Sequence, residues 1–427
     1  MPTAYQQTLA DLYALEAKKG MDFRLERLDP VLEALGHPES AFTCVHLAGT
    51  NGKGSTSAMI ASALVEGGYR TGLYTSPHLV SFRERIRVDG VAIARAAVVD
   101  RVAAVRDAEA ACGANLTFFE IATLAAFLEF RERGVRVAVL EAGLGGRLDV
   151  TNVARGDVAV ITSVGIDHAE FLGHTLAEVA REKAAIIKEG STAVTGALHP
   201  EAEAVVAERV AAVGAKRLAW GRDFTAYAPM EQAQARRPGG VLAGVHQAHN
   251  AALAAAAVGA LSAMHPARFP TTSAAVEKGI LGVRWPGRLE VLRRRRGDGP
   301  LVMDAAHNPE AASVLADALD TVAPSHPRVL VFAAMGDKDW PSMLAALAPR
   351  FDRVFFAPLP IPRAADPALF LEAVPGGTVA TSALEALELA DEAASAHGSV
   401  VVTGSIFLLG HLYRPAGGAL LEDDLID

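Results

Sequence analysis

Short β-rich runs alternate along the chain with alanine-rich stretches of helical periodicity, and this alternation restricts the fold more than any other feature. In the first half, each run begins in apolar residues and ends in small or polar ones. These runs are FTCVHLAG, TGLYTSP, RVAVLEAGLG, VAVITSVGID and TAVTG. Strands that alternate with helices form a parallel sheet covered by helices. The sequence therefore predicts an α/β fold.

A second alternating set follows in the last third of the chain. Its runs are PLVMDAAHNP, RVLVFAAMGDKD, RVFFAPL, GGTVAT and SVVVTGS. Because 427 residues exceed the usual size of one core, we expect two domains, at 1–287 and 301–427. The linker is expected at 288–300, where proline, glycine and arginine interrupt the periodicity. The arginine run 293–296 is more typical of a solvated turn than of a site for an anionic partner.

The first strand leads into a helix through GTNGKGS, Gly49–Ser55. Backbone N–H groups at such a turn point outward at the positive end of the helix dipole, which is a geometry that binds phosphate. Lys53 adds a charge for the outer phosphates, and a hydroxyl inside the helix can face magnesium. The spacing departs from the common phosphate-loop pattern, because Gly54 separates Lys53 from Ser55. An ordinary strand-to-helix turn is the alternative.

Polar residues stand at the ends of neighbouring strands. In open α/β sheets, ligands bind beyond the carboxyl ends of the strands. Ser76, Glu141, Asp167 and His168 are therefore expected around the phosphate loop.

The composition excludes several classes of function. With a net charge of -9 and 51% hydrophobic residues, the chain has no electrostatic bias toward nucleic acid, and small ligands are expected. Cys44 and Cys112 offer neither a disulfide framework nor a metal knuckle, which predicts a reducing compartment. The N-terminal segment is unlike a targeting signal, and no apolar run is long enough to span a bilayer. We therefore expect a cytoplasmic protein without nucleic-acid or membrane partners.

Ten motifs in order resemble those of folylpolyglutamate synthases, including the bifunctional bacterial dihydrofolate synthases. They are GTNGKGS, TSPHLVSFRERI, EAGLGGRLDVTN, ITSVGIDHAEFLG, EKAAIIKEG, HQAHN, WPGRLE, MDAAHNP, GDKDW and TGS. The resemblance covers most of the chain, beginning near LERLDPVLEALG. It implies a Mur-ligase-like phosphate-loop domain followed by a smaller Rossmann-like domain, with the active site between them. It also implies a monomeric ATP-dependent amide ligase acting on L-glutamate and on dihydropteroate or reduced folates.

The resemblance assigns an ATP site and two magnesium sites. The residues implied for ATP are Thr50, Asn51, Gly52, Lys53, Gly54, Ser55, Asn250, Arg288 and Asp304. Ser76 and Glu141 would hold one magnesium ion and His168 a second. The alternatives are a salt bridge for Arg288, helix caps for Asn250 and Asp304, and a structural hydrogen bond for His168.

Lys183 in EKAAIIKEG is the third residue to which the resemblance gives a catalytic role, beside Lys53 and His168. In the family, a lysine at this position has added carbon dioxide to become a carbamate, whose oxygens suit magnesium. The alternative is a surface lysine that pairs with Glu178 or Glu182 on its own helix.

The resemblance also implies two substrate sites. Residues for the pterin-bearing substrate are Thr117, Phe118, Phe119, Glu120, Leu148, Asp149 and Val150. The two phenylalanines could instead be core residues, and many bifunctional members carry alanine where this chain has Val150. The loop after Ser76, with Arg83, Arg85 and Arg87, is expected to close over the cleft. His307 and Thr403–Ser405 are candidates for the glutamate pocket.

Three other functions stand as alternatives. A monofunctional folylpolyglutamate synthase would not use dihydropteroate. A Mur-type peptidoglycan ligase shares the chemistry, but usually carries a further domain before the phosphate loop, where only about forty-eight residues stand here. A phosphate-loop switch or ATPase would hydrolyse nucleotide without forming an amide, and would need no second Rossmann-like unit.

Overall fold

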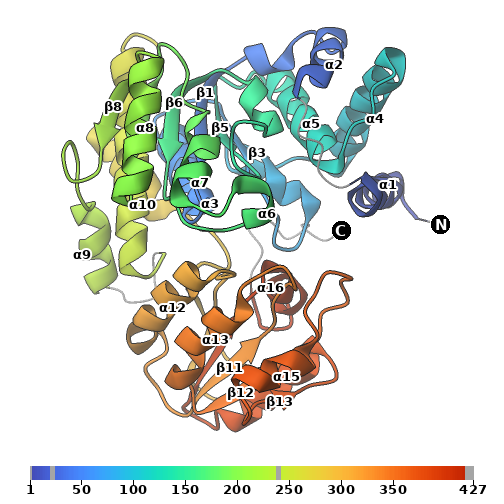
Figure 1. The fold of residues 1–427 in the computed structure, drawn as a ribbon, viewed down its shortest axis with the longest axis vertical. Coiled ribbons are helices and arrows are strands. Elements are labelled where there is room, and N and C mark those ends of the chain that lie inside the picture. Colours follow the sequence, from blue (N-terminus) through green and yellow to red (C-terminus); the bar gives the residue numbers. More distant parts are fainter. Residues whose placement is uncertain (1, 20–24, 237–241, 419–427) are drawn as a thin grey trace. The chain divides into compact units, whose positions relative to one another are not determined.

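The computed structural model describes residues 2–19, 25–236 and 242–418 (Figure 1). The chain divides into two compact units. The first unit comprises Met1–Tyr227 and His249–Gly282, and the second comprises Ala228–Ala248 and Val283–Ile426. Each unit has its own sheet with helices around it, so the predicted α/β class is confirmed.

The described part of the first unit contains an eight-stranded sheet. Its strands, in spatial order, are β4 (Val91–Ala92), β3 (Ile86–Val88), β2 (Thr71–Tyr74), β5 (Val137–Glu141), β1 (Thr43–Ala48), β6 (Gly156–Ile161), β7 (Thr192–Thr195) and β8 (Lys216–Ala219). Six neighbouring strands run parallel: β2, β5, β1, β6, β7 and β8. At one edge, β3 pairs antiparallel with β2 and with β4. The carboxyl ends of β1, β5 and β6 therefore lie side by side at one edge of the sheet.

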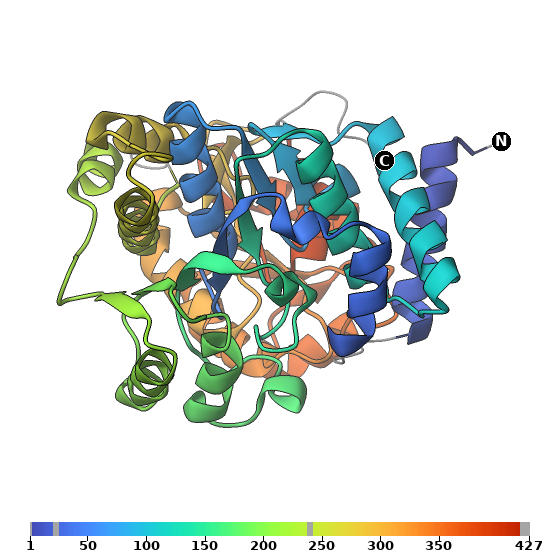
Figure 2. The same cartoon turned by 90° about the horizontal axis from the view of Figure 1, so that it is seen from above.

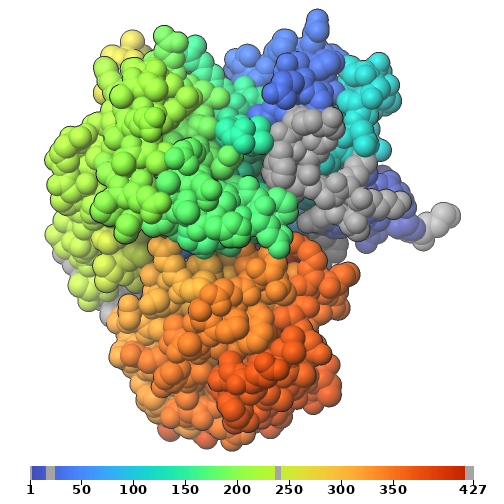
Figure 3. Space-filling model, in the orientation of Figure 1, coloured from blue at the N-terminus to red at the C-terminus, as the bar shows by residue number. Residues whose placement is uncertain are grey.

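Helices pack on and around this sheet. They are α1 (Ala4–Lys19), α2 (Asp29–Ala34), α3 (Lys53–Glu66), α4 (Arg95–Cys112), α5 (Phe118–Glu132), α6 (Ala169–Leu172), α7 (Leu176–Ala184), α8 (Pro200–Ala212), α11 (Ser273–Gly282) and α10 (Val245–Met264), whose first turn is assigned to the second unit. Four 3-10 helices are η1 (Leu25–Leu28), η2 (Pro38–Ser40), η3 (Phe82–Arg85) and η4 (Val150–Val153). Helix α1 lies alongside α4 (Figure 2), and α8 forms part of the surface drawn in green in Figure 3.

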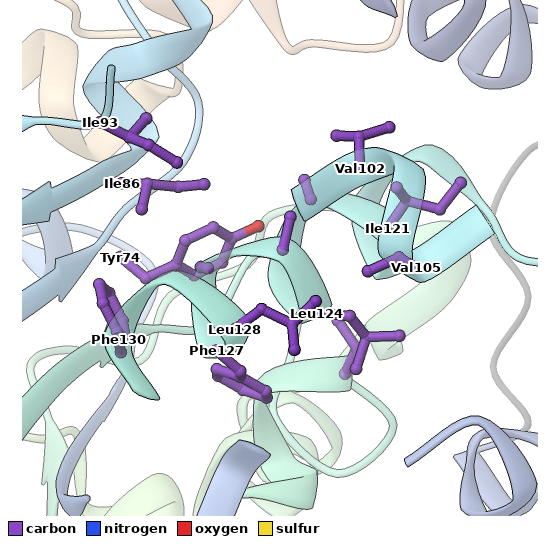
Figure 4. Packing of buried hydrophobic residues seen from close by; sticks show 14 of the residues in the cluster. Tyr74, Ile86, Ile93, Val102, Val105, Ile121, Leu124, Phe127, Leu128 and Phe130 are labelled. Atoms are coloured by element: carbon purple, nitrogen blue, oxygen red, sulfur yellow. The ribbon is translucent and has the colours of Figure 1, made fainter. Parts of the chain in front are cut away.

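Helix α5 is the most deeply buried helix of the first unit. Its sequence FFEIATLAAFLEF is apolar on nearly all sides, which is typical of a helix enclosed by other elements. Phe127 and Phe130 are fully buried in the hydrophobic cluster around Tyr74 (Figure 4). The Thr123 hydroxyl donates to the Tyr74 hydroxyl at 2.9 Å. Gly72 of β2 leaves room for this helix, because a Cβ atom there would lie 2.8 Å from the Phe130 ring.

The described part of the second unit contains a six-stranded sheet. Its strands, in spatial order, are β13 (Thr378–Val379), β12 (Arg353–Phe356), β11 (Arg328–Phe332), β14 (Ser399–Thr403), β10 (Pro300–Met303) and β9 (Glu290–Arg293). Its helices are α9 (Ala228–Arg236), α12 (Pro309–Val322), α13 (Trp340–Leu347), α14 (Phe370–Ala373), α15 (Ala383–Ala393) and α16 (Ile406–Leu412), with η5 (Ala348–Arg350) and η6 (Pro367–Leu369). All strands except the edge strand β9 are parallel to their neighbours.

The interval 288–300 is not the bare linker that the sequence suggested. It contains β9, which pairs antiparallel with β10 and belongs to the second sheet. Glycine and proline in this interval mark the ends of strands, and the short strand between them has no strong pattern of its own.

The expectation of a solvated arginine turn is wrong for Arg294, although Arg293, Arg295 and Arg296 are exposed. The Arg294 side chain is fully buried. Its Nε donates to Asp391 Oδ1 at 2.6 Å, its Nη1 to Gly398 O at 2.6 Å, and its Nη2 to Asp391 O at 2.6 Å. This arginine therefore joins β9 to the end of α15 and to the turn before β14.

Two further expectations concern the cysteines and the membrane. Cys44 is buried, Cys112 is exposed, and both are free thiols. Among the described helices, none combines the length and apolar character needed to cross a bilayer.

The buried arginine gives a stability prediction. Replacing Arg294 by Met should destabilise the second unit by about 3–5 kcal/mol, because Asp391 would remain buried without its charge partner. The matched control is Arg295→Met, an exposed neighbour whose replacement should change stability by less than about 0.5 kcal/mol. Urea unfolding of both variants measures the difference, and equal midpoints would contradict the structural role of Arg294.

Candidate active site

The predicted phosphate loop lies between β1 and α3. Gly52 has φ +83° and caps the N-terminus of α3, so a residue with a side chain would be strained there. A Cβ atom at Gly52 would also lie 2.6 Å from Asn250 Oδ1. The structure therefore brings Asn250 against the loop, although the two are almost two hundred residues apart.

Hydrogen bonds fasten this loop to the residues after β6. The Thr50 hydroxyl donates to Gly165 O at 2.9 Å and accepts from Gly165 N at 2.9 Å. Asn51 N donates to Ser163 Oγ at 2.9 Å, and the Thr162 hydroxyl donates to Asn51 O at 2.7 Å. The loop is thus held on the side of β6, and the segment that leads to His168 begins at the same place.

Lys53 folds back over the loop. Its Nζ donates to Gly49 O at 2.9 Å and to Thr50 O at 3.3 Å. In this position the ammonium group lies at the turn where the backbone N–H groups of the helix terminus gather. The arrangement is suited to an anion with several negative charges.

Lys183 is buried close to Lys53. Its side chain comes from α7, and the residue is only 3% exposed. Burial, and then the positive charge of Lys53, lower the pKa of Lys183 to about 7, while Asp167 acts in the opposite direction. The neutral amine is therefore well populated near neutral pH.

The surface-lysine alternative for Lys183 is wrong. Glu178 caps α7 by accepting from the Thr175 hydroxyl, and Glu182 accepts from Arg147 Nε at 2.9 Å. Both acids of the helix thus have other partners, and Lys183 itself points into the protein.

Ser76 and Glu141 lie together at the ends of β2 and β5. Ser76 N donates to Glu141 Oε2 at 3.3 Å, and Glu141 is buried. Within the described residues, no three histidine, cysteine or acidic side chains are grouped so that they could hold a metal ion by themselves. Magnesium at a nucleotide site commonly takes one or two carboxylates and completes its shell with phosphate and water. The hydroxyl and carboxylate oxygens of Ser76 and Glu141 fit that requirement.

His168 occupies the left-handed region, with φ +51°, at the N-terminus of the short helix α6. Its backbone N–H donates to Asp167 Oδ1 at 2.9 Å, and its Nε2 lies 4.0 Å from the same oxygen. Its side chain is about one-third exposed, at 38%. His168 therefore stands beside a carboxylate on the segment that follows β6.

The TFFE motif opens helix α5, and two of its residues form a capping box. Thr117 accepts from Glu120 N, and Glu120 accepts from Thr117 N at 2.7 Å and from the Thr117 hydroxyl at 2.8 Å. Both Glu120 oxygens also contact Arg27 Nη2. Arg27 was not among the predicted site residues, although it lies in LERLDPVLEALG, where the family resemblance begins. The Glu120 carboxylate is thus engaged by protein donors.

The two phenylalanines of TFFE differ in their surroundings. Phe118 is buried in the core of the first unit, at 6% exposure, as the alternative interpretation allowed. Phe119 is partly exposed and lies against the loop after β5, because a Cβ atom at Gly143 would be 2.5 Å from its ring. Of the pair, Phe119 is the one with surface available to a ligand.

Asp149 is buried and organises its own loop. Its carboxylate accepts from Leu144 N at 2.9 Å, from Thr151 N at 3.0 Å and from the Thr151 hydroxyl. His46, whose pKa burial lowers to about 3, shares the Thr151 hydroxyl at 2.9 Å. Burial raises the pKa of Asp149, and these donors oppose the rise.

The residues on either side of Asp149 differ in exposure. Val150 is a core residue at 3% exposure, and Leu148 is partly exposed.

In the second unit, the predicted residues gather at the ends of β10 and β14. Asp304 accepts from Leu289 N at 2.8 Å and from Ala306 N at 2.9 Å. Burial raises its pKa and the nearby charge of Arg288 opposes the rise. Gly404 N donates to Ala306 O at 3.1 Å, so the TGS turn meets this segment.

His307 follows Asp304 in the same segment. Its Nδ1 lies 2.9 Å from Ala305 O and donates to that carbonyl. Ser405 caps α16, as Asn308 caps α12. The candidate glutamate residues His307 and Thr403–Ser405 therefore share one edge of the second sheet.

Comparison with known proteins gives matches over both units. The Mur ligase middle domain family matches residues 47–258, and the Mur ligase glutamate ligase domain family matches residues 287–406. The folylpolyglutamate synthase of Lacticaseibacillus casei is 36% identical over 428 residues, which cover 95% of this chain and 96% of the relative.

Two solved structures are similar along the same length. The Escherichia coli enzyme FolC in complex with DHPP and ADP has a TM-score of 0.84 at 31% identity, covering 97% of this chain and 99% of its own. The bifunctional folylpolyglutamate synthase/dihydrofolate synthase of Yersinia pestis, complexed with AMPPNP and Mn ion, has a TM-score of 0.83 at 30% identity and the same coverage.

The buried lysine gives a prediction for stability against pH. An unfolded lysine keeps its proton up to about pH 10.5, whereas folded Lys183 releases it near pH 7, so the parent should gain stability as pH rises between these values. Lys183→Met removes this dependence, and its advantage over the parent should be larger at about pH 6 than at about pH 9. Urea midpoints in buffer free of carbon dioxide measure the difference. An advantage that grew with pH would contradict the burial of an ammonium group.

Proposed function

Because the chain belongs to the folylpolyglutamate synthase and dihydrofolate synthase family of Mur-type ligases, we propose that the phosphate loop, the Ser76–Glu141 pair and the buried Lys183 form its catalytic centre. The protein is an ATP-dependent ligase that joins L-glutamate to the carboxylate of a folate-type acceptor. The observation that carries the assignment is the first unit's clustering of a helix N-terminus, Lys53 and a buried second lysine.

The chemistry requires that a carboxylate be made reactive. It takes the γ-phosphoryl group of ATP to become an acyl phosphate, and the amino group of glutamate then displaces phosphate to form the amide. In the first unit, Thr50–Ser55 bind the phosphates through backbone N–H groups, Lys53 holds the outer phosphates, and Asn250 contacts the nucleotide beside Gly52. In the second unit, Arg288 and Asp304 bind nucleotide, and His307 binds glutamate.

Two magnesium sites complete the proposal. Ser76 and Glu141 would hold the first ion, and His168 with modified Lys183 the second; when bound, these ions supply positive charge to the γ-phosphoryl group. Hard oxygen donors at Ser76 and Glu141 support the first assignment. The Yersinia pestis structure has manganese bound, which supports the use of a divalent cation.

The pterin-bearing substrate is assigned to the same unit, near Thr117–Glu120 and Leu148–Val150. The partly exposed Phe119 and Leu148 are suited to contact a flat ring, whereas Glu120 and Asp149 act mainly by holding the two segments in shape. We assign the protein to the cytoplasm, since its proposed substrates are small metabolites and its cysteines are free thiols. The family resemblance supports a monomer.

The environment of Lys183 supports its proposed carbamylation. A neutral amine attacks carbon dioxide, forms an N–C bond and releases a proton, and a pKa near 7 provides that neutral amine. The product is an anion, so it replaces the repulsion between Lys53 and Lys183 by attraction. It also gives an oxygen donor where an ammonium group has none to offer.

Removal of the Lys183 side chain should greatly reduce activity, and an added small carboxylate should restore part of it. Lys183→Ala should lose activity by roughly a hundredfold to a thousandfold, and acetate or formate should restore part of it. Lys188→Ala is the matched control, because this half-buried lysine of the same segment donates, within the described part of the chain, only to Asn152 O, at 3.4 Å. It should keep its activity and show no response to acetate. An active Lys183→Ala enzyme would refute the carbamate.

An acceptor assay tests the function itself. With ATP, magnesium and glutamate, the purified protein should form product with dihydropteroate and with tetrahydrofolate, and phosphate release should require both glutamate and an acceptor. Separation of products by mass identifies each amide. Product with tetrahydrofolate alone would restrict the protein to folylpolyglutamate synthesis, and phosphate release without an acceptor would indicate an ATPase.

A further inference from the structure

Arg85 is a buried arginine beside the proposed pterin site. It is the last residue of η3, in the segment after Ser76, and it is 7% exposed. Its Nε donates to His78 Nδ1 at 2.8 Å, and its Cζ lies 5.1 Å from the centroid of the Phe118 ring. The guanidinium group is therefore positioned by one hydrogen bond, to His78, and by the ring of Phe118.

The charge of Arg85 has no acidic partner in the described chain. Its neighbour Glu84 accepts from the backbone N–H groups of Leu79, Val80 and Ser81 at 3.0, 2.8 and 2.7 Å. His78 is a neutral acceptor, since burial and the charge of Arg85 lower its pKa well below the usual value. Burying a guanidinium group without an anion costs free energy of folding unless other acceptors take up its N–H groups.

Other arginines of the segment are arranged differently. Arg83 Nε donates to Ile93 O, and Arg87 Nη1 donates to Gly90 O at 2.9 Å. Each of these side chains fastens the segment to its own backbone. Arg85 Nη1 and Nη2, by contrast, donate to no residue of the described chain.

The surroundings of Arg85 are those of the acceptor substrate. Phe118 belongs to the TFFE motif, and Tyr74, whose ring lies 6.0 Å from that of Phe119, is close enough for the charges of both Arg85 and Asp149 to act on its pKa. Figure 4 shows Tyr74 between Ile86 of the neighbouring strand and helix α5. Arg85 thus lies beside the TFFE segment and close to Tyr74, whose pKa also responds to the charge of Asp149.

Two parallel N–H groups of an arginine match two acceptors at one edge of a flat ring, as they do with O6 and N7 of guanine. A 7,8-dihydropterin presents the same pattern, with O4 and the imine nitrogen N5 side by side. A tetrahydropterin keeps O4 but carries a hydrogen on N5. Resting on the proposed function, we infer that Arg85 binds the O4–N5 edge of the 7,8-dihydropterin and so favours dihydropteroate over tetrahydrofolate as acceptor.

The test compares two acceptors in two variants of the full chain. Arg85→Met should lower kcat/KM for dihydropteroate roughly tenfold to a hundredfold, through KM, and should lower that for tetrahydrofolate much less. The KM for ATP should not change. Arg87→Met is the matched control, a buried arginine of the same segment that should leave the ratio of the two acceptors unaltered. Arg85→Lys keeps the charge without the fork and should lose the preference as well.

Equal losses with both acceptors, or no loss with either, would overturn the inference. Equal losses accompanied by a lower melting temperature would identify Arg85 as structural only. Calorimetric binding of 7,8-dihydropterin needs no turnover and separates this inference from the proposed function. If 7,8-dihydropterin binds more weakly to Arg85→Met than to the parent, the inference about Arg85 is supported. If the parent binds the pterin but forms no amide, the ligase assignment alone is refuted. Equal binding by the parent and the variant overturns the inference.

Discussion

The close approach of the loop after β1 to the chain after β6 is the constraint on which the first unit depends. A Cβ atom at Gly49 would lie 1.8 Å from the Thr162 hydroxyl oxygen, so no other residue fits there without movement of one of the two segments. That contact lets Thr50 and Asn51 exchange hydrogen bonds with residues 163–165. Because β1 and β6 are parallel neighbours, these hydrogen bonds set the direction in which the N-terminus of α3 faces. They also anchor the segment that carries His168.

Positive charge is concentrated near the carboxyl ends of these strands. Lys53 and Lys183 are close enough that each charge disfavours the other, and Arg85 is buried with no acidic partner among the described residues. Such arrangements cost stability and are relieved by anions or polar acceptors from a ligand. Perturbed groups of this kind cluster at functional sites, and the substrates proposed here, a nucleotide triphosphate and a pterin carboxylate, supply negative charge and acceptors.

The sequence was sufficient for features determined by local pattern and insufficient for those determined by distant partners. The strands and the turn from β1 into α3 follow from periodicity and from the local residue types. Arg294 pairs with Asp391, 97 residues away, and Glu120 pairs with Arg27, 93 residues away. The sequence around either residue therefore does not predict the ion pair. Motif resemblance pointed to segments for the substrate, but it could not tell a side chain that faces a ligand from one that shapes the loop.

The glycines of EAGLGG illustrate that second kind of role. A Cβ atom at Gly146 would lie 2.8 Å from Glu182 O, and Arg147 N donates to the same oxygen at 2.8 Å. The loop that leads to Asp149 therefore rests directly on the backbone of α7, one residue before Lys183. A larger residue at Gly146 would have to push apart the segment assigned to the pterin and the helix that carries the proposed catalytic lysine. The glycine is thus needed for the distance between two parts of one site, and it needs no contact with a ligand to be required for activity.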